Sequence, residues 1–220
     1  YLEECDQVLE ALGTPVQERY DLLKSHHATA EKRYYPLAQE VITGTYVGDY
    51  DYVLDLLDRC YFPTREGVAN FHDNFVDALI LAGEEKIAEG KVEQAVTLYK
   101  KAFTYPENHQ VFLVDERATH DAQINYCLGE AYAALGQDAE AEKYWKLAAE
   151  QDYELKGSKD FRYWTGLALE RLGRKAEAEA IFSALVADGE AAVVTQHVNF
   201  YGAEGTTGVT VDIINSAAYY

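Results

Sequence analysis

The sequence predicts an all-α fold in which about four helix-turn-helix units stack into a right-handed superhelix. The first observation is a glycine that recurs along the chain, at Gly48, Gly90, Gly136 and Gly173. Each is followed five residues later by a small or β-branched apolar residue, at Val53, Ala95, Ala141 and Ala178. A large residue comes four positions later still, at Leu57, Tyr99, Trp145 and Phe182. In the last three units another glycine stands seven residues before the first, at Gly83, Gly129 and Gly166.

Each unit is expected to be a helix, a tight turn and a second helix. The turn glycine supplies the left-handed backbone conformation that ends the first helix. The small residue of the second helix lets the two helices approach, and the large residue one turn later fills space on the same face. The earlier glycine thins the first helix where its partner crosses it. Apolar residues recur with helical spacing around these positions, as at Ile124, Leu128, Ala131, Tyr132 and Leu135.

The segment before the repeats reads as one or two further helices. A stripe of apolar residues ends at Gly13 and consists of Leu2, Cys5, Val8, Leu9 and Leu12. Thr14-Pro15 then predicts a helix start, because proline is favoured in a first turn. The buried face is expected to continue through Val16, Tyr20, Leu23 and His27.

The first unit departs from the pattern, and the linkers between units carry insertions. Val41 stands where the later units have their first glycine, and Val53 stands where they have alanine. The alanine-type positions are 42, 46 and 37 residues apart. The inserts are residues 61–72 and 104–118. Loops of repeat proteins fall on one face and often carry binding residues.

This pattern resembles the tetratricopeptide repeat, which runs W-x2-L-G-x2-Y…A-x3-F…P with a period of about 34 residues. The best copy is Leu128-Gly129, Tyr132, Gly136, Ala141, Trp145 and Ala148. Arg65-Glu66-Gly67, Tyr105-Pro106-Glu107-Asn108 and the Leu128-Gly129 repeat bring a narrower resemblance over roughly residues 30–190. They are similar to a bacterial architecture in which a tetratricopeptide region follows a β-sandwich resembling carbohydrate mutarotases. The β-sandwich is absent here, so the resemblance assigns no carbohydrate role and no catalytic residue to this chain.

The domain prediction is a helical-repeat domain over residues 1–190 and an irregular tail over 191–220. The tail breaks the repeat pattern with Gly202, Gly205 and Gly208, and Asn215-Ser216 then reads as the cap of a further helix. The chain begins at Tyr1 and contains no methionine, which is expected of a processed form or a fragment.

Composition narrows the classes of partner. The chain has 19 basic and 38 acidic residues and a formal charge of -19. Such a surface repels phosphate backbones and anionic membranes, so neither nucleic acid nor membrane is expected as a partner. A basic protein partner would associate faster, although high acidity is also a common solubility feature. Three cysteines without a CxxC spacing argue against a zinc or redox motif and favour the cytoplasm, with the periplasm as the alternative.

The sequence offers no motif for catalysis, a cofactor or a metal site. Nucleotide-binding glycine patterns and the standard hydrolase and metalloprotease motifs are absent. Glu116 and His120 share a helix face but lack a third ligand, so a solvated helix start is the simpler interpretation. His26 and His27 are adjacent and should point to different faces, one packed and one solvated. We therefore expect no enzyme activity from this chain alone.

Two sets of residues are candidate binding positions. The first lines the expected concave face, which the first helix of each unit forms. It consists of Asp77, Ile80 and Glu84, then Gln123, Tyr126 and Glu130, then Asp160, Tyr163 and Glu170. Tyrosines among carboxylates suit a basic or polar peptide, or a sugar. The second set is the insert site of Arg65, Glu66 and His72, for which a structural loop held by arginine–carboxylate pairing is the alternative.

The predicted function is a protein-interaction scaffold that uses these two surfaces. The alternative is an accessory module of a larger carbohydrate-active bacterial enzyme, packed on a neighbouring β-sandwich through Arg65, Glu66 and His72. A homo-oligomer formed through exposed terminal repeats is a third hypothesis.

Overall fold

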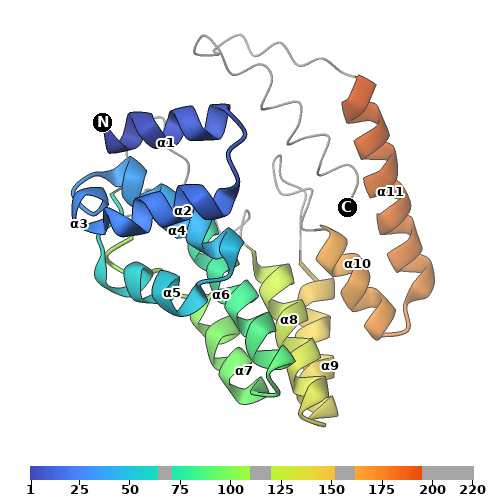
Figure 1. Cartoon of the computed structure of the whole chain (residues 1–220). Helices are drawn as coiled ribbons and strands as arrows, with labels where there is room; N and C mark the ends of the chain where they lie inside the picture. Colours follow the sequence, from blue (N-terminus) through green and yellow to red (C-terminus); the bar gives the residue numbers. More distant parts are fainter. Residues whose placement is uncertain (64–70, 110–119, 152–161, 195–220) are drawn as a thin grey trace. The chain divides into compact units, whose positions relative to one another are not determined.

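The computed structural model describes residues 1–63, 71–109, 120–151 and 162–194, and regular structure in these ranges is helical (Figure 1). A single isolated bridge joins Phe62 and His109 there. The helices are α1 (Leu2–Ala11), α2 (Val16–Ser25), α3 (His27–Ala30), α4 (Tyr34–Val47), α5 (Tyr50–Arg59), α6 (His72–Ala88), α7 (Val92–Lys101), α8 (Asp121–Ala134), α9 (Asp138–Ala149), α10 (Arg162–Arg171) and α11 (Lys175–Val194). The all-α solenoid prediction is confirmed.

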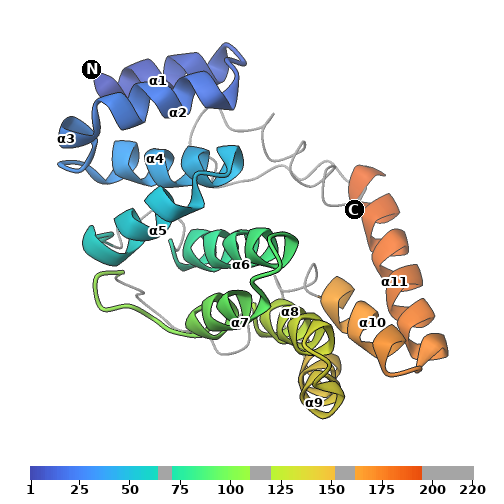
Figure 2. The ribbon, with the colours of Figure 1, turned by 60° about the horizontal axis from the view of Figure 1, so that its bottom comes forward.

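The helices fall into two compact units. The first contains α1–α7 together with residues 131–136, and the second contains residues 121–130 of α8 with α9–α11. In the described ranges three helices precede the repeats, against the one or two expected, and four helical hairpins then follow as predicted: α4/α5, α6/α7, α8/α9 and α10/α11. Figure 2 shows the two helices of the α6/α7 hairpin side by side. No helix of the described ranges is long and apolar enough to cross a membrane.

The turn glycines end the first helix of each hairpin in the predicted way. Their φ angles are +82° at Gly48, +77° at Gly90, +69° at Gly136 and +76° at Gly173. A residue with a Cβ atom adopts this left-handed conformation only with steric strain. Glycine has no Cβ atom and therefore closes the turn without that strain.

In each of the last three hairpins, the glycine in the middle of the first helix packs directly against the large residue of the second helix. A Cβ atom on Gly83 would lie 2.2 Å from Tyr99 Cε1. The equivalent approaches are 2.3 Å at Gly129 to Trp145 Cδ1 and 2.4 Å at Gly166 to Phe182 Cε1. The alanines of the second helices, at residues 95, 141 and 178, are buried. The packing role given to both kinds of position is confirmed.

The first hairpin achieves the same packing with different residues. Val41 and Leu57 occupy the glycine and aromatic positions, and both are fully buried. A larger first residue is therefore matched by a smaller second one, which conserves volume. The close approach lies instead at Gly44, where a Cβ atom would be 2.7 Å from Val53 Cγ2 and 2.9 Å from Tyr20 Cε2. Gly44 thus admits α2 against this hairpin, a role that the repeat pattern did not reveal.

The expectation for the first helix was wrong. Its apolar stripe is not a core face, because Val8 is 57% exposed, Leu12 is 75% exposed and Cys5 is also exposed. The residue of α1 that is fully buried is Asp6. Arg19 Nε donates to Asp6 Oδ1 at 2.9 Å and Arg19 Nη2 donates to Asp6 Oδ2 at 3.0 Å. This bidentate ion pair, rather than apolar burial, sets the side of α1 that faces the chain.

The described ends of the two inserts pack together on the C-terminus of α5. The Phe62 amide donates to Asn108 O at 2.8 Å. The Asn108 carboxamide donates to the carbonyl oxygens of Leu57 at 2.9 Å and Cys60 at 2.6 Å. His109 Nε2 donates to the same Leu57 oxygen at 2.8 Å. We call Phe62, Asn108 and His109 the insert clasp; it satisfies carbonyls that the end of a helix leaves without intrahelical partners.

Helix α11 reaches Val194, so regular structure extends past residue 190, where the tail was predicted to begin. The rest of the tail, with the expected helix start near Asn215, lies outside the described residues.

Candidate functional site

The predicted concave-face residues of the first unit lie on α6. Asp77 and Glu84 are exposed there, whereas Ile80, which was assigned to the same face, is buried and belongs to the core. Neighbouring protein atoms partly desolvate the Glu84 carboxyl and raise its pKa, although the residue is exposed. Desolvation likewise raises the pKa of Tyr50, with a contribution from the negative charges of Glu85 and Glu84. This face therefore carries an acidic group beside a tyrosine.

In the second unit, Tyr126 and Glu130 of α8 meet residues of α9 and α10. The Tyr126 ring lies 5.5 Å from the Trp164 ring, centroid to centroid. Glu130 Oε1 accepts a hydrogen bond from Trp145 Nε1 at 3.1 Å, and Glu130 Oε2 accepts one from Arg171 Nη2 at 2.5 Å. Glu130 is thus a paired acid that joins three helices, rather than an unpaired carboxylate in a groove.

Arg171 is the centre of this cluster. Its guanidinium also forms a hydrogen bond with Tyr126 and lies 6.0 Å from the centre of the Trp145 ring. Burial raises the pKa of Tyr126, so its hydroxyl stays protonated at neutral pH. Arg171 could not be predicted as a partner of Glu130 from spacing, because the two residues stand 41 positions apart.

The remaining residues of this set lie apart from the Arg171 cluster or outside the described ranges. Gln123 on α8 is half-buried, and its Oε1 lies 3.2 Å from His120 Nδ1. Tyr163 on α10 is 39% exposed, and its ring is 6.0 Å from that of Phe182 on α11. Glu170 is exposed on the same helix. Asp160 lies outside the described residues.

An open groove of about 620 Å³ lies along α10 and α11. It is lined by Glu170, Lys175, Glu179, Phe182, Ser183 and Val186. Glu170 is the predicted site residue among them. The groove combines an apolar strip with charged rims, which can hold a peptide side chain and pair with a charge beside it.

At the insert site, only His72 is described. It is 7% exposed at the start of α6, and its ring is stacked on that of Tyr105 with centroids 4.1 Å apart. His72 therefore packs one insert against the other. Arg65 and Glu66 lie outside the described residues, as does Glu116, the proposed partner of His120.

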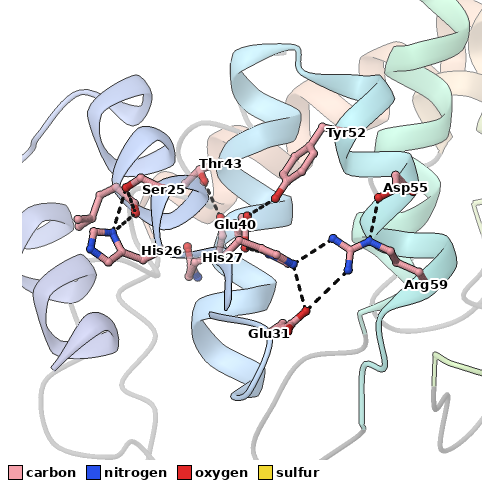
Figure 3. Close-up of polar contacts among 11 residues, drawn as sticks. Ser25, His26, His27, Glu31, Glu40, Thr43, Tyr52, Asp55 and Arg59 are labelled. Atoms are coloured by element: carbon pink, nitrogen blue, oxygen red, sulfur yellow. Dashed lines mark hydrogen bonds and ion pairs between the residues drawn. The ribbon is translucent and has the colours of Figure 1, made fainter. Parts of the chain in front are cut away.

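A polar cluster in the first unit was not anticipated (Figure 3). Its centre is Glu40 of α4, a carboxylate with no exposed surface. Tyr52 Oη of α5 donates to Glu40 Oε1 at 2.7 Å, and His27 Nδ1 lies 2.9 Å from Glu40 Oε2. The cluster thereby joins α3, α4 and α5. A glutamate between the apolar residues of a buried helix face was the signal for it, because such a carboxylate needs partners.

Charged groups surround the His27 ring. Its Nδ1 faces the Glu40 carboxylate at 2.9 Å, and Arg59 Nη2 lies 3.0 Å from its Nε2. Glu31 Oε2 lies 3.2 Å from the same Nε2, and Arg59 also donates to Asp55 at 2.8 Å. His26 is exposed and contacts the Ser25 hydroxyl and the Leu22 carbonyl, so the two histidines divide as the sequence predicted.

Within the described part of the chain, no three His, Cys, Asp or Glu side chains are grouped so that they could hold a metal ion. Tyr52 and His27 occupy the two carboxylate oxygens of Glu40. Its chemistry is that of a structural network.

The comparisons with known proteins add little to this geometry. No protein-family model matches the sequence, and no curated protein does. A solved structure titled "MamA RS-1 ArsTM double mutant" is similar to this chain with a TM-score of 0.45 and 20% sequence identity. The similarity covers 83% of this chain and 89% of that chain. The tetratricopeptide-like fold is therefore assigned from the hairpins, their turn glycines and their glycine–aromatic contacts.

Proposed function

We propose that this chain is a non-catalytic scaffold that holds a peptide or protein segment in the groove between the two helices of its last hairpin. The observation that carries the proposal is the groove along α10 and α11. Glycine–aromatic contacts fill the interior of each later hairpin. Glu170 is exposed and lines this groove, and Tyr163 is exposed beside its residue Phe182. Exposed aromatic and charged side chains on a rigid helical surface are the usual means by which repeat proteins bind segments of other proteins.

The groove chemistry favours a segment that is both apolar and basic. Phe182 and Val186 offer apolar surface, and Glu170 and Glu179 supply two negative charges against the single positive charge of Lys175. The charge of -19 over the whole chain acts in the same direction by speeding the approach of cations. A sugar ligand would use Tyr163 through its ring face but would not respond to the charges of the two glutamates.

Charge reversal at the groove tests the proposal. Peptide arrays of apolar–basic and apolar–acidic sequences are probed with the full chain and with Glu170→Lys/Glu179→Lys. We expect the wild type to retain the basic set and the double variant to shift towards the acidic set. Glu93→Lys is the control, because Glu93 is exposed on α7 and does not line this groove. Equal binding of both peptide sets by wild type and double variant would contradict the proposal.

The accessory-module function is a separate proposal. It places the chain beside a β-sandwich of the same parent protein, with contacts from Arg65, Glu66 and His72. Because His72 is stacked on Tyr105, its contribution would be to order the insert rather than to touch the neighbour. The parent reading frame tests this proposal: an all-β domain encoded upstream supports it, and its absence removes the basis for a carbohydrate-related role.

A further inference from the structure

The outward face of α1 is an apolar stripe on a helix that contains no lysine or arginine. Tyr1, Cys5, Val8 and Leu12 are all exposed, and their spacing of four, three and four residues is that of a helix–helix seam. We call these four residues the α1 stripe. A contiguous exposed apolar strip on a folded protein is typical of a surface that another molecule covers.

The buried ion pair explains why the stripe faces outward. Asp6 and Arg19 are both buried, and Arg19 also donates to Glu10 Oε1 at 2.8 Å and to Gln39 Oε1 at 3.3 Å. Rotating α1 to bury Val8 and Leu12 would separate Asp6 from Arg19 and leave both charges buried without a partner. Breaking a buried pair in this way costs about as much as exposing two aliphatic side chains, and it would also remove the hydrogen bonds of Arg19 to Glu10 and Gln39. The ion pair therefore fixes α1 with its apolar side towards solvent.

The charges beside the stripe define what fits it. Helix α1 carries Glu3, Glu4 and Glu10 in addition to Asp6, and it has no lysine or arginine. Arg19 pairs with Asp6 and Glu10, and Glu4 contacts the Tyr1 amino group, so Glu3 and Glu4 are the acids of α1 that no lysine or arginine side chain pairs with in the described contacts. Glu18 and Asp21 are exposed on α2, where Lys24 is held by Asp49. A second copy of the chain would bring another charge of -19 against the first, which opposes self-association through this face.

We propose that the α1 stripe is the docking surface for an amphipathic helix of a partner protein, with an apolar seam flanked by lysine or arginine. The seam packs on Val8 and Leu12, and the basic flanks pair with Glu3 and Glu4. This surface shares no residue with the α10/α11 groove and does not depend on the function proposed for that groove.

The test uses two synthetic helical peptides of about two heptads with leucine at the seam positions, one flanked by lysine and one by glutamate. Binding to the full chain is measured by fluorescence anisotropy at low and high salt. We expect the lysine peptide to bind, to weaken with salt, and to lose about tenfold or more in affinity with Val8→Ser/Leu12→Ser. Leu147→Ser is the matched control, because it removes an exposed leucine from α9 and should leave the affinity unchanged.

A charge variant keeps the test decisive even if the serine variant is poorly folded. Glu4→Lys should weaken binding of the lysine peptide and improve binding of the glutamate peptide. The proposal is overturned if both peptides bind wild type equally, or if the serine and charge variants bind the lysine peptide as wild type does. It is also overturned if light scattering shows a dimer that Val8→Ser/Leu12→Ser dissociates, because a second copy would then cover the stripe. Crosslinking of peptides to the α10/α11 groove should be unchanged in all these variants.

Discussion

The first and last hairpins, α4/α5 and α10/α11, share one backbone plan but fill it in different ways. In α10/α11, Gly166 gives room to the Phe182 ring. In α4/α5, the two corresponding positions hold Val41 and Leu57, and the buried carboxylate of Glu40 lies on the same first helix. The later hairpin depends on one tight contact, whereas the first depends on matched volumes and a hydrogen-bonded network. The shared backbone arrangement therefore constrains the combined volume of the two side chains more than the identity of either residue.

The largest effect is expected from overfilling a later hairpin. Gly83→Val puts methyl groups where Tyr99 Cε1 stands 2.2 Å from the ideal Cβ position, and should lower the free energy of unfolding by about 3 kcal/mol. Adding Tyr99→Leu recreates the valine–leucine pair of the first hairpin and should restore about half of the loss. Urea denaturation followed by circular dichroism measures both. A double variant no more stable than Gly83→Val would show that the two hairpins are not interchangeable.

A slightly smaller effect is expected from breaking the network of the first hairpin. Glu40→Ala leaves the Tyr52 hydroxyl and His27 Nδ1 without their buried acceptor, and should destabilise the chain by about 2 kcal/mol. Asp55→Ala is the control: it removes an exposed partner of Arg59 and should cost about 0.5 kcal/mol. Similar losses from the two variants would mean that Glu40 does not hold α3, α4 and α5 together.

The insert clasp should make stability depend on pH. Burial lowers the pKa of His109, so the unfolded chain takes up a proton at a higher pH than the folded one. The contribution of His109 is complete above its ordinary pKa of about 6.5 and is lost as pH falls below that value, with a slope of at most about 1.4 kcal/mol per pH unit. His109→Gln keeps a donor for Leu57 but does not titrate. Denaturation midpoints between neutral and mildly acidic pH should fall more for wild type than for this variant, and parallel curves would refute the assignment.

The smallest effect is expected at the half-exposed ion pair of the second unit. Arg171→Ala removes the partner of Glu130, and because both groups reach solvent the loss should stay below about 1 kcal/mol. Added salt should reduce the difference between this variant and wild type, whereas the loss from Glu40→Ala should respond little to salt. A loss as large as that of Glu40→Ala would place Glu130 and Arg171 among the principal supports of the fold.

The repeated features of the fold could be predicted from the sequence, whereas individual side-chain pairs that do not recur could not. Turn glycines and glycine–aromatic pairs have fixed offsets, so the hairpins could be placed from spacing alone. The partnership of Glu130 with Arg171 has no such offset, and neither does that of Phe62 with Asn108. Such pairs meet because of the fold and become visible only with coordinates.

The error at α1 has a related cause. Helical periodicity finds an apolar stripe but cannot tell whether that stripe faces the core or solvent. The deciding residues were Asp6 and Arg19, whose pairing spans a turn between two helices. Of the candidate binding residues, Tyr163 and Glu170 are exposed at or beside a groove, and Tyr126 and Glu130 are already occupied by Arg171. What they bind stays a prediction.

The Asn108 carboxamide contacts Leu57 across 51 residues of chain, and this distance has a consequence for the order of folding. The α6/α7 hairpin lies inside that span, and its own contacts are between neighbours in sequence. Closing this long loop has an entropic cost, and that cost is smaller once the segment inside the loop is already compact. The hairpin should therefore form early, and the junction at the end of α5 should close last, sealing a segment that is already structured.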